Sequence, residues 1–385
     1  MIAPDSRSTT ENPHRGMAID DEASAYDQKR APHQDHPSSS YRAYQVTGQR
    51  NFALVERELR EPGDREVRIR TLACGVCHTD SLAAEGLRSD PSSPLVPGHE
   101  IIGAIDAVGA FVDRRWQVGD RVGLGFLGGP CHECPYCRRG DFVNCTDQPQ
   151  PGTTVDGGYA EMVYARPSGL VRIPDGYDAL TAAPLLCAGV TMFNALRAAH
   201  APLNSVVAIQ GIGGLGHLGV QYAKMMGFRV VAIARGSEKG PLAQEMGADY
   251  YIDSTAEDPA AALSALGGAA AIVATAASGS SMGALVAGLR SRGRLVIVGA
   301  SPEPVPITTT DLIFGERSIQ GSITGSAADI EEGLEFGLSH QIAPTIEAMP
   351  FTEAPAAYER MMSGRARFRV VLEFGANAPS ASAAT

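Results

Sequence analysis

The sequence lacks long apolar runs and has no excess of positive charge. No apolar stretch among its 385 residues approaches the ~20 residues that a membrane-spanning helix needs. The formal net charge of −11 at pH 7 argues against nucleic acid or an anionic membrane as the main partner. The opening residues MIAPDSRSTTENPHRG lack the apolar segment of a secretory signal. We therefore expect a cytoplasmic protein that binds neither nucleic acid nor membrane.

The chain divides into segments that differ in composition and hydrophobic pattern. Residues 1–40 are rich in Ser, Pro, His and Asp without a hydrophobic period and predict a disordered tail, and residues 376–385 predict a second tail. The length between them exceeds what one hydrophobic core usually serves, so two domains are expected. Residues 41–188 carry short alternating apolar runs punctuated by Gly and Pro, which predict a mainly β domain.

Residues 189–325 follow a different pattern, in which short apolar strands alternate with helices. Strands are expected at 205–210, 229–234, 249–253, 270–276 and 294–300, and helices at 213–227 and 239–248. This alternation predicts a parallel sheet with helical crossovers. Residues 326–375, with a helix at 328–338 and a strand at 369–374, are expected to return to the first domain, which gives an α/β protein.

A glycine-rich turn follows the first of these strands. Gly211, Gly213 and Gly216 form G-x-G-x-x-G, with Gly214 and Leu215 inside the motif, and a helix is expected to start there. Such glycines let backbone N–H groups and a helix N-terminus approach a pyrophosphate. We interpret this turn as a dinucleotide-binding site, although a Gly-rich turn that packs tightly and binds nothing has the same pattern.

The end of the next strand bears on the choice between NAD and NADP. An acidic residue at this position would bind the ribose hydroxyls of NAD. The strand instead ends at Ala234 and is followed by Arg235, which could pair with a 2′-phosphate. We therefore expect NAD(P) binding with NADP slightly favoured; the alternative is that Arg235 is a solvated loop residue and that either cofactor is accepted.

Four of the seven cysteines lie in one short stretch. Cys131, Cys134, Cys137 and Cys145 have the spacing C-x2-C-x2-C-x7-C. In a reducing compartment cysteines at such spacing are more often metal ligands than disulfides. Four thiolates close a tetrahedral zinc site without an open position, which predicts a structural zinc. An iron–sulfur cluster is the alternative, but the last spacing and the absence of Pro after Cys145 favour zinc.

The other three cysteines are Cys74, Cys77 and Cys187. Together with His99 in VPGHEIIG, Cys77 and Cys187 would make a Cys2His zinc site with a fourth position free for water or substrate. That ligand set is the one used for alcohol oxidation. Cys74 is then a small buried residue, and the C-x-x-C of TLACGVCHTD is not a redox pair. The sequence thus predicts two zinc ions per subunit.

From about residue 41 to 375 the chain resembles the zinc-dependent medium-chain alcohol dehydrogenases. The matching stretches are GVCHTD, GHE, the four-cysteine stretch, PLLCAGVT, GIGGLGHLGVQYAKMMG and RVVL. The resemblance implies a GroES-like, mainly β catalytic domain (residues 41–188 and 326–375) split by a Rossmann domain (189–325). It also implies a homodimer or homotetramer.

The resemblance also implies roles for single residues. Glu100 would be an acid beside the catalytic metal, Asp80 the carboxylate that orients the ligand histidine, and Thr79 the hydroxyl that takes the alcohol proton. His78 and Arg369 would contact the cofactor pyrophosphate, and Val298 belongs to the expected cofactor-binding set. A surface or core role is the plain alternative for each.

The chain departs from the family pattern at two places. Leu82 stands where many members have a histidine that completes a proton relay, and the tryptophans that narrow the pocket of ethanol-preferring members are missing, since the single Trp is Trp116. Phe126 and Leu127 are the expected pocket walls. We expect an alcohol dehydrogenase or aldehyde reductase for larger primary or secondary alcohols; a polyol or cinnamyl-type dehydrogenase and a non-catalytic cofactor-binding relative are the alternatives.

Overall fold

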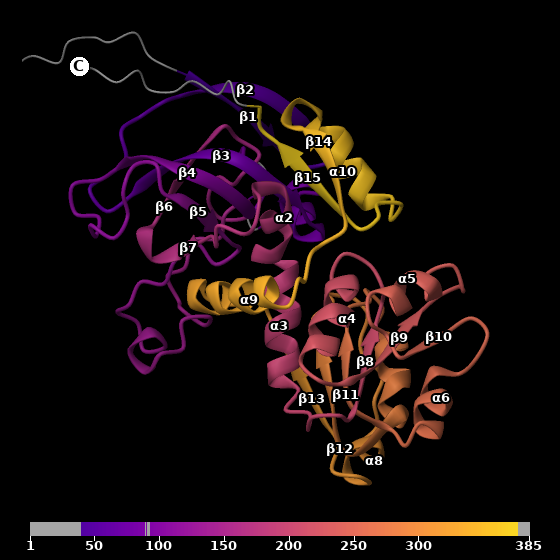
Figure 1. Ribbon diagram of the computed structural model, residues 1–385. Helices are drawn as coiled ribbons and strands as arrows, with labels where there is room; N and C mark the ends of the chain where they lie inside the picture. The colour runs from indigo at the N-terminus through magenta and orange to yellow at the C-terminus, as the bar shows by residue number, and fades with distance from the viewer. Residues whose placement is uncertain (1–39, 89, 91–92, 376–385) are drawn as a thin grey trace, which may run out of the picture. The chain divides into compact units, whose positions relative to one another are not determined.

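The computed structural model describes residues 40–88, 90 and 93–375 (Figure 1). The predicted tail at 376–385 lies outside these residues, as does the tail at 1–40 except for its last residue, Ser40. That residue begins a strand, because β1 (Ser40–Val46) and β2 (Phe52–Glu58) pair as an antiparallel hairpin in which Ser40 lies opposite Glu58. The described residues belong to one compact unit.

A seven-stranded, largely antiparallel sheet contains residues from both ends of this unit. Its order is β14-β15-β3-β4-β5-β7, with β6 pairing β3. The strands are β3 (Val67–Val76), β4 (Glu100–Val108), β5 (Arg121–Leu124), β6 (Met162–Ala165), β7 (Leu170–Arg172), β14 (Ile346–Pro350) and β15 (Arg369–Glu373). Because β15 pairs antiparallel with β3, Arg369 at its start is brought close to the end of the strand that contains Cys74.

A six-stranded parallel sheet has the order β10-β9-β8-β11-β12-β13. Its strands are β8 (Val206–Gln210), β9 (Arg229–Ala234), β10 (Tyr250–Asp253), β11 (Ala269–Ala274), β12 (Leu289–Ile297) and β13 (Ser318–Gly321). Numbered within the sheet, this is the 3-2-1-4-5-6 order of a doubly wound dinucleotide-binding fold. The central strands are buried on both faces, which explains their continuous Val, Ile and Ala runs.

Ten α-helices occur among the described residues. They are α1 (Ser81–Ala84), α2 (Ala179–Ala182), α3 (Ala188–Ala198), α4 (Gly216–Met225), α5 (Gly240–Glu245), α6 (Pro259–Ala265), α7 (Gly279–Gly283), α8 (Thr309–Ile313), α9 (Ala327–Ser339) and α10 (Ala354–Met362). α3 packs against both α4 and α9 (Figure 1). One cluster of buried apolar residues reaches from Ile102 in β4, through α3, to Ile209 in β8, so the two sheets share a core.

No single helix of the described part is long and apolar enough to cross a membrane. The helical stretches Ala179–Leu186 and Ala188–Ala198 reach that length and composition only as a pair, and they are bent by 45° where they meet.

Candidate active site

Two strand ends and one helix start bring together a cluster of metal-binding side chains. Cys77 follows β3, His99 precedes β4, and Cys187 directly precedes α3. The ligand atoms of Cys77, His99, Glu100 and Cys187 all lie within 4.8 Å of one another. The structure therefore assembles the predicted Cys2His set from segments that are far apart in the sequence, and it adds Glu100 to the set.

His99 is oriented so that one ring nitrogen is free to bind a metal. Its Nδ1 lies 3.0 Å from Asp80 Oδ1, and the other oxygen of Asp80 accepts the Cys77 N–H at 2.9 Å and the Tyr159 hydroxyl at 3.0 Å. The buried Nε2 of His99 has no hydrogen-bond partner. A buried polar atom without a partner is costly unless it binds something else, so this geometry fits a zinc ligand held by an outer carboxylate. Tyr159, fully buried beneath Asp80, was not predicted from the sequence.

Glu100 lies at the junction of the metal-binding cluster and Arg369. One of its oxygens accepts a hydrogen bond from the Arg369 guanidinium, while the other is buried without a partner. Burial raises the pKa of Glu100 to about 7, although the nearby Arg369 lowers it. The carboxylate fits because Gly75 lies opposite Glu100 in the β3–β4 ladder, where a Cβ would come within 1.8 Å of Glu100 Oε2.

The two cysteines of the cluster differ in their readiness to ionise. The Cys187 thiol donates a hydrogen bond to Cys77, and this bond, together with the nearby His99, lowers the pKa of Cys77 well below the usual thiol value. The same hydrogen bond and burial raise the pKa of Cys187. Thr79 Oγ1 lies 3.8 Å from Cys77 Sγ, next to the cluster. The side chain of His78 is exposed beside it.

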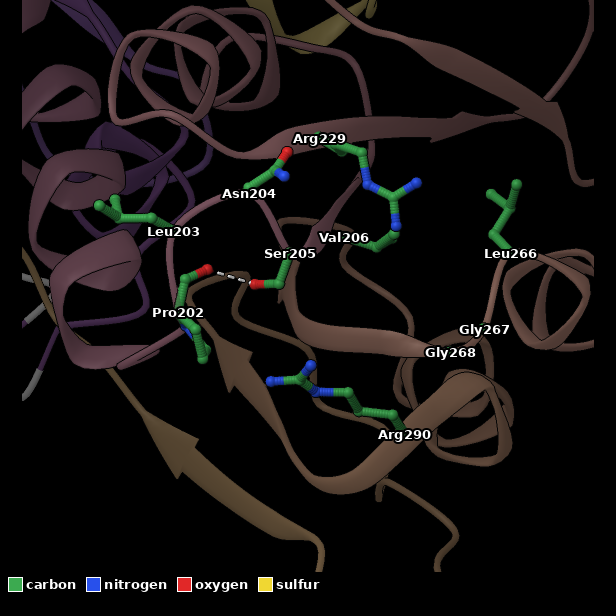
Figure 2. Close-up of a pocket in the computed structure, with 10 residues that line it drawn as sticks. All are labelled: Pro202, Leu203, Asn204, Ser205, Val206, Arg229, Leu266, Gly267, Gly268 and Arg290. Atoms are coloured by element: carbon green, nitrogen blue, oxygen red, sulfur yellow. Dashed lines mark hydrogen bonds between the residues drawn. The ribbon is translucent and has the colours of Figure 1, made fainter.

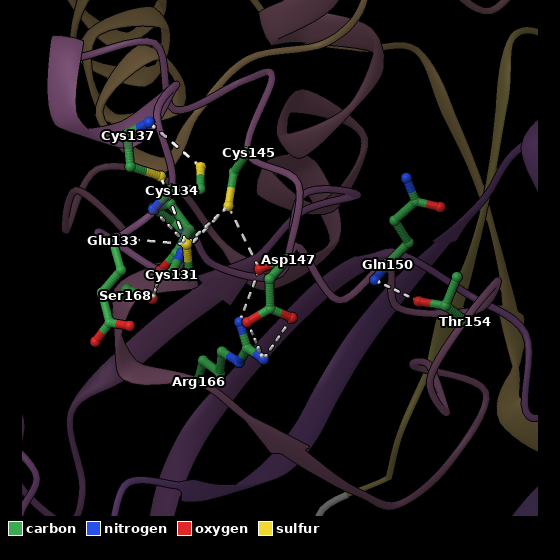
Figure 3. Close-up of polar contacts among 11 residues, drawn as sticks. Cys131, Glu133, Cys134, Cys137, Cys145, Asp147, Gln150, Thr154, Arg166 and Ser168 are labelled. Atoms are coloured by element: carbon green, nitrogen blue, oxygen red, sulfur yellow. Dashed lines mark hydrogen bonds and ion pairs between the residues drawn. The ribbon is translucent and has the colours of Figure 1, made fainter.

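The four remaining cysteines gather in an irregular lobe, which we define as residues 131–145 (Figure 3). Sγ of Cys131 lies 3.5 Å from that of Cys145 and 4.0 Å from that of Cys137. Four sulfurs about 2.3 Å from one tetrahedral zinc ion would lie about 3.8 Å apart. The sulfur spacing therefore fits a closed four-thiolate site.

Backbone amides point at these sulfurs. The N–H groups of Glu133 and Cys134 donate to Cys131 Sγ at 3.5 and 3.4 Å, and that of Cys137 donates to Cys134 Sγ at 3.5 Å. The last of these amides is the main reason that the pKa of Cys134 lies at about 6. Such donors stabilise thiolates, which are the form that binds metal.

The glycine-rich turn has the shape that a dinucleotide site requires. Gly211 adopts a φ of +88°, which favours glycine, and a Cβ on Gly216 would lie 1.9 Å from Gly211 O. Gly213 instead faces open space, where a phosphate could approach the backbone. α4 begins at Gly216 rather than at residue 213 as predicted, because the three preceding residues form the turn itself.

The predicted cofactor residues share the carboxyl edge of the parallel sheet. Gly211, Arg235 and Val298 directly follow β8, β9 and β12, which end within one residue of one another in the register of the sheet. Parallel strands of this order bind dinucleotides at that edge. Ala234 is the buried last residue of β9, and Arg235 beyond it is exposed.

Two further cations near Arg235 were missed by sequence reasoning. Burial, Arg367 and Arg235 lower the pKa of Lys239, so both arginines lie near this lysine. The negative charge of Glu238 raises the pKa of Lys239, and the Glu238 carboxylate lies close to Gly236. A lysine four positions after Arg235 is a signal that the sequence offered, whereas Arg367 is distant in the chain.

Phe126 lies beside the metal-binding cluster, whereas a surface pocket lies far from it on the parallel sheet. The Phe126 ring meets His99 edge-on with centroids 5.5 Å apart, while Leu127 is buried. A pocket of about 340 Å³ lies instead at the amino ends of β8, β9 and β12, where Arg229 and Arg290 line it (Figure 2). That is the sheet edge opposite the glycine-rich turn, so the pocket is not part of the site.

Comparisons with known proteins agree with this fold. The chain matches two family models, "Alcohol dehydrogenase GroES-like domain" over residues 63–175 and "Zinc-binding dehydrogenase" over residues 214–339. It therefore belongs to the zinc-dependent medium-chain alcohol dehydrogenase family, which confirms the predicted α/β fold with GroES-like and Rossmann parts. The chain is an oxidoreductase of the alcohol dehydrogenase type.

The matches to individual relatives extend over nearly the whole length of those relatives. The chain is 43% identical over 322 residues to the alcohol dehydrogenase notN of Aspergillus sp. strain MF297-2, covering 83% of this chain and 94% of that protein. It resembles the acetophenone reductase of Geotrichum candidum in complex with NAD (28% identity, TM-score 0.77, 87% of this chain and 97% of that one). It also resembles CAD from Helicobacter pylori complexed with NADP(H) (26% identity, TM-score 0.76, 87% and 98%).

Proposed function

We propose that this protein is a zinc- and NAD(P)-dependent alcohol dehydrogenase that works as an aldehyde reductase on larger substrates. The observation that carries the proposal is the position of Arg369, which contacts Glu100 of the metal-binding cluster and lies against Gly214 of the dinucleotide turn. A site that joins a Cys2His set to a dinucleotide turn suits hydride transfer between a bound alcohol and a nicotinamide.

Each residue of the site has a proposed task. A zinc ion held by Cys77, His99 and Cys187 would supply the Lewis acidity that lowers the pKa of an alcohol and polarises a carbonyl. Asp80 keeps the His99 proton on Nδ1, so Nε2 stays free. Thr79, beside Cys77, holds the hydroxyl that exchanges a proton with the substrate oxygen.

The proton path and the pocket differ from those of ethanol-preferring relatives. Leu82, in α1, offers no acceptor, so the proton held by Thr79 leaves without a histidine relay. Phe126 provides an aromatic wall beside His99. This wall supports an aromatic or long aliphatic alcohol as the substrate; a polyol or cinnamyl-type alcohol is the second candidate within the same chemistry.

NADP is the proposed preferred cofactor. Arg235 at the end of β9, with Lys239 and Arg367 near it, supports recognition of a 2′-phosphate, which carries up to two negative charges. Glu238 acts against this preference. The cofactor pyrophosphate is assigned to the glycine-rich turn and Arg369, with His78 as a further contact.

A second zinc ion is proposed for the four-cysteine lobe, where it would stabilise structure only. The closed four-thiolate set leaves no open position for substrate. None of the seven cysteines is in a disulfide, which supports metal binding by six of them in a reducing compartment such as the cytoplasm.

A homodimer formed through the parallel sheet is proposed, with a tetramer as the alternative. In the described residues β13 is the last strand of its sheet, and its outer edge has no partner strand. Large apolar side chains are exposed close to it in sequence: Ile313 is 67% exposed, Phe314 75% and Ile323 56%. An unpaired edge flanked by exposed apolar residues suits pairing with a second copy.

The first experiment is to measure initial rates of benzaldehyde reduction by zinc-replete protein with NADPH and with NADH. Turnover that favours NADPH is expected. A preference for NADH would keep the enzyme and reject the argument from Arg235. The matched variants are Cys77→Ser, which should abolish turnover with an unchanged circular dichroism spectrum, and Cys74→Ala, which removes a buried non-ligand thiol from the preceding strand β3 and should remain active. No turnover with either cofactor across a wider substrate panel would favour the non-catalytic alternative.

A further inference from the structure

His217 is a fully buried polar side chain that none of the proposed roles uses. It follows Gly216 at the start of α4. Its Nδ1–H donates to Gly213 O, inside the dinucleotide turn, at 2.9 Å, and its Nε2 accepts from the Thr345 N–H at 3.3 Å. Only a neutral ring with its proton on Nδ1 satisfies both partners. The ring therefore connects the turn to a segment 128 residues further along the chain.

Thr345 in turn holds the start of β15. Its carbonyl accepts the N–H groups of both Phe368 and Arg369, each at 3.0 Å. The His217 ring also stacks on Phe368, with centroids 4.8 Å apart and planes 26° from parallel. The backbone of Arg369 is thus fixed to the glycine-rich turn through one imidazole ring and one threonine.

The side chain of Arg369 has a donor that its protein contacts leave unused. It is 4% exposed, and one end of its guanidinium bonds Glu100. Nη1 lies 2.9 Å from the position that a Cβ on Gly214 would take, while Nε is buried without a hydrogen-bond partner. An unsatisfied buried guanidinium N–H beside a turn built for phosphates points to an anionic ligand.

We propose that His217 is a positioning residue that holds Arg369 against the dinucleotide turn, so that the cofactor phosphates meet a guanidinium already in place. The proposal rests on the NAD(P) binding proposed above. One hydrogen bond of the ring fixes the turn at Gly213, and the other fixes the segment that carries Arg369. A preplaced pair of phosphate-binding elements binds more tightly, because less freedom is lost on binding.

The test is a double-mutant cycle on cofactor affinity, measured by NADPH fluorescence with zinc-replete protein. His217→Phe keeps an aromatic ring against Phe368 but loses both hydrogen bonds, and we expect the NADPH Kd to rise about tenfold. Arg369→Lys keeps a cation beside Glu100 but loses the guanidinium fork. In that background His217→Phe should raise the Kd less than twofold further, because the group that His217 positions is already gone.

A second variant on α4 separates positioning from stability. Tyr222→Phe removes a buried hydrogen bond to Gly333 O of 3.1 Å from the same helix and should lower thermal stability without changing the NADPH Kd. His217→Gln, whose amide can replace one of the two bonds, should give an intermediate Kd.

Three outcomes would overturn the proposal. In the first, His217→Phe changes the Kd less than twofold. In the second, His217→Phe changes the NADPH Kd by the same factor in the wild-type and in the Arg369→Lys background. In the third, wild-type protein binds neither NADPH nor NADH, which would overturn the proposed function as well.

Discussion

The four-cysteine lobe allows a quantitative test of the proposed structural zinc, because few interactions other than metal ligation would stabilise the lobe. Its only regular element is a single 3₁₀ turn, Cys137–Arg139, and Cys137 is the only residue of the lobe that is buried. A segment without an apolar core gains its stability from metal binding. We therefore expect Cys145→Ser to loosen the lobe while the rest of the fold remains.

The size of the effect follows from the loop that Cys145 closes. Releasing this ligand opens a loop of about 15 residues that begins at Cys131, and closing a loop of that length is worth about 3 kcal/mol. Hydrogen bonds from Gly128 N to Pro149 O (2.8 Å) and from Ser168 Oγ to Pro130 O (3.0 Å) anchor the flanks, so the loosening stays local. A loss of about 3 kcal/mol raises the open population about a hundredfold.

Limited proteolysis with trypsin measures that population, because Arg138 and Arg139 are exposed within the lobe. Cys145→Ser should be cleaved there about a hundredfold faster than wild type, with zinc content reduced from two ions to about one per subunit. Cys187→Ser is the matched variant: it should lose the other ion and all turnover but resist trypsin like wild type. If Cys145→Ser kept both ions and the wild-type cleavage rate, the structural-zinc argument would be refuted. Iron in place of zinc would support the cluster interpretation.

Three further predictions concern the cofactor, the pH dependence and the assembly. Arg235→Asp should lower the NADPH/NADH ratio of kcat/KM at least about tenfold, whereas Arg229→Asp at the other end of β9 should not; an unchanged ratio would mean that Arg235 does not meet the phosphate. Burial lowers the pKa of His217 from 6.5 to about 4, so its neutral form stabilises the fold fully above pH 6.5 and that contribution, about 3 kcal/mol, is lost as the pH falls to 4. Urea unfolding at pH 7 and 4.5 should show a weaker pH dependence for His217→Phe than for wild type, and equal dependence would contradict the assignment. Phe314→Asp should yield a smaller species by light scattering, and an unchanged mass would place the interface elsewhere.

Features that depend on neighbouring residues could be predicted from the sequence. The four cysteines of the lobe span one short stretch, and the glycine-rich turn lies between one strand and one helix, so spacing alone indicated both. Helix α3 was missed because eight of its eleven residues are buried, so few polar positions mark its exposed face. Strand β13 was missed because it is short and lies at a sheet edge, without an apolar alternation.

Features that depend on distant residues could not be predicted in this way. Tyr159 donates a hydrogen bond to Asp80, which is 79 residues away in the sequence, and the residues around each give no indication of the other. The sequence likewise could not indicate that Arg367, from the far end of the chain, lies near Lys239 beyond the end of β9. Such contacts exist only once the sheets have formed and set their registers.

The contact between Arg369 and Glu100 gives this long-range packing a functional consequence. β15 must pair with β3 to bring Arg369 beside Glu100, and α4 must pack near the start of β15 for His217 to reach Thr345. The buried carboxylate of Glu100 would carry an uncompensated charge without this arginine, so correct assembly of the metal-binding cluster and of the phosphate site are linked energetically. A substitution at either end of the link should therefore affect both sites. Independent metal and cofactor affinities across the His217 and Arg369 variants would show instead that the two sites are merely adjacent.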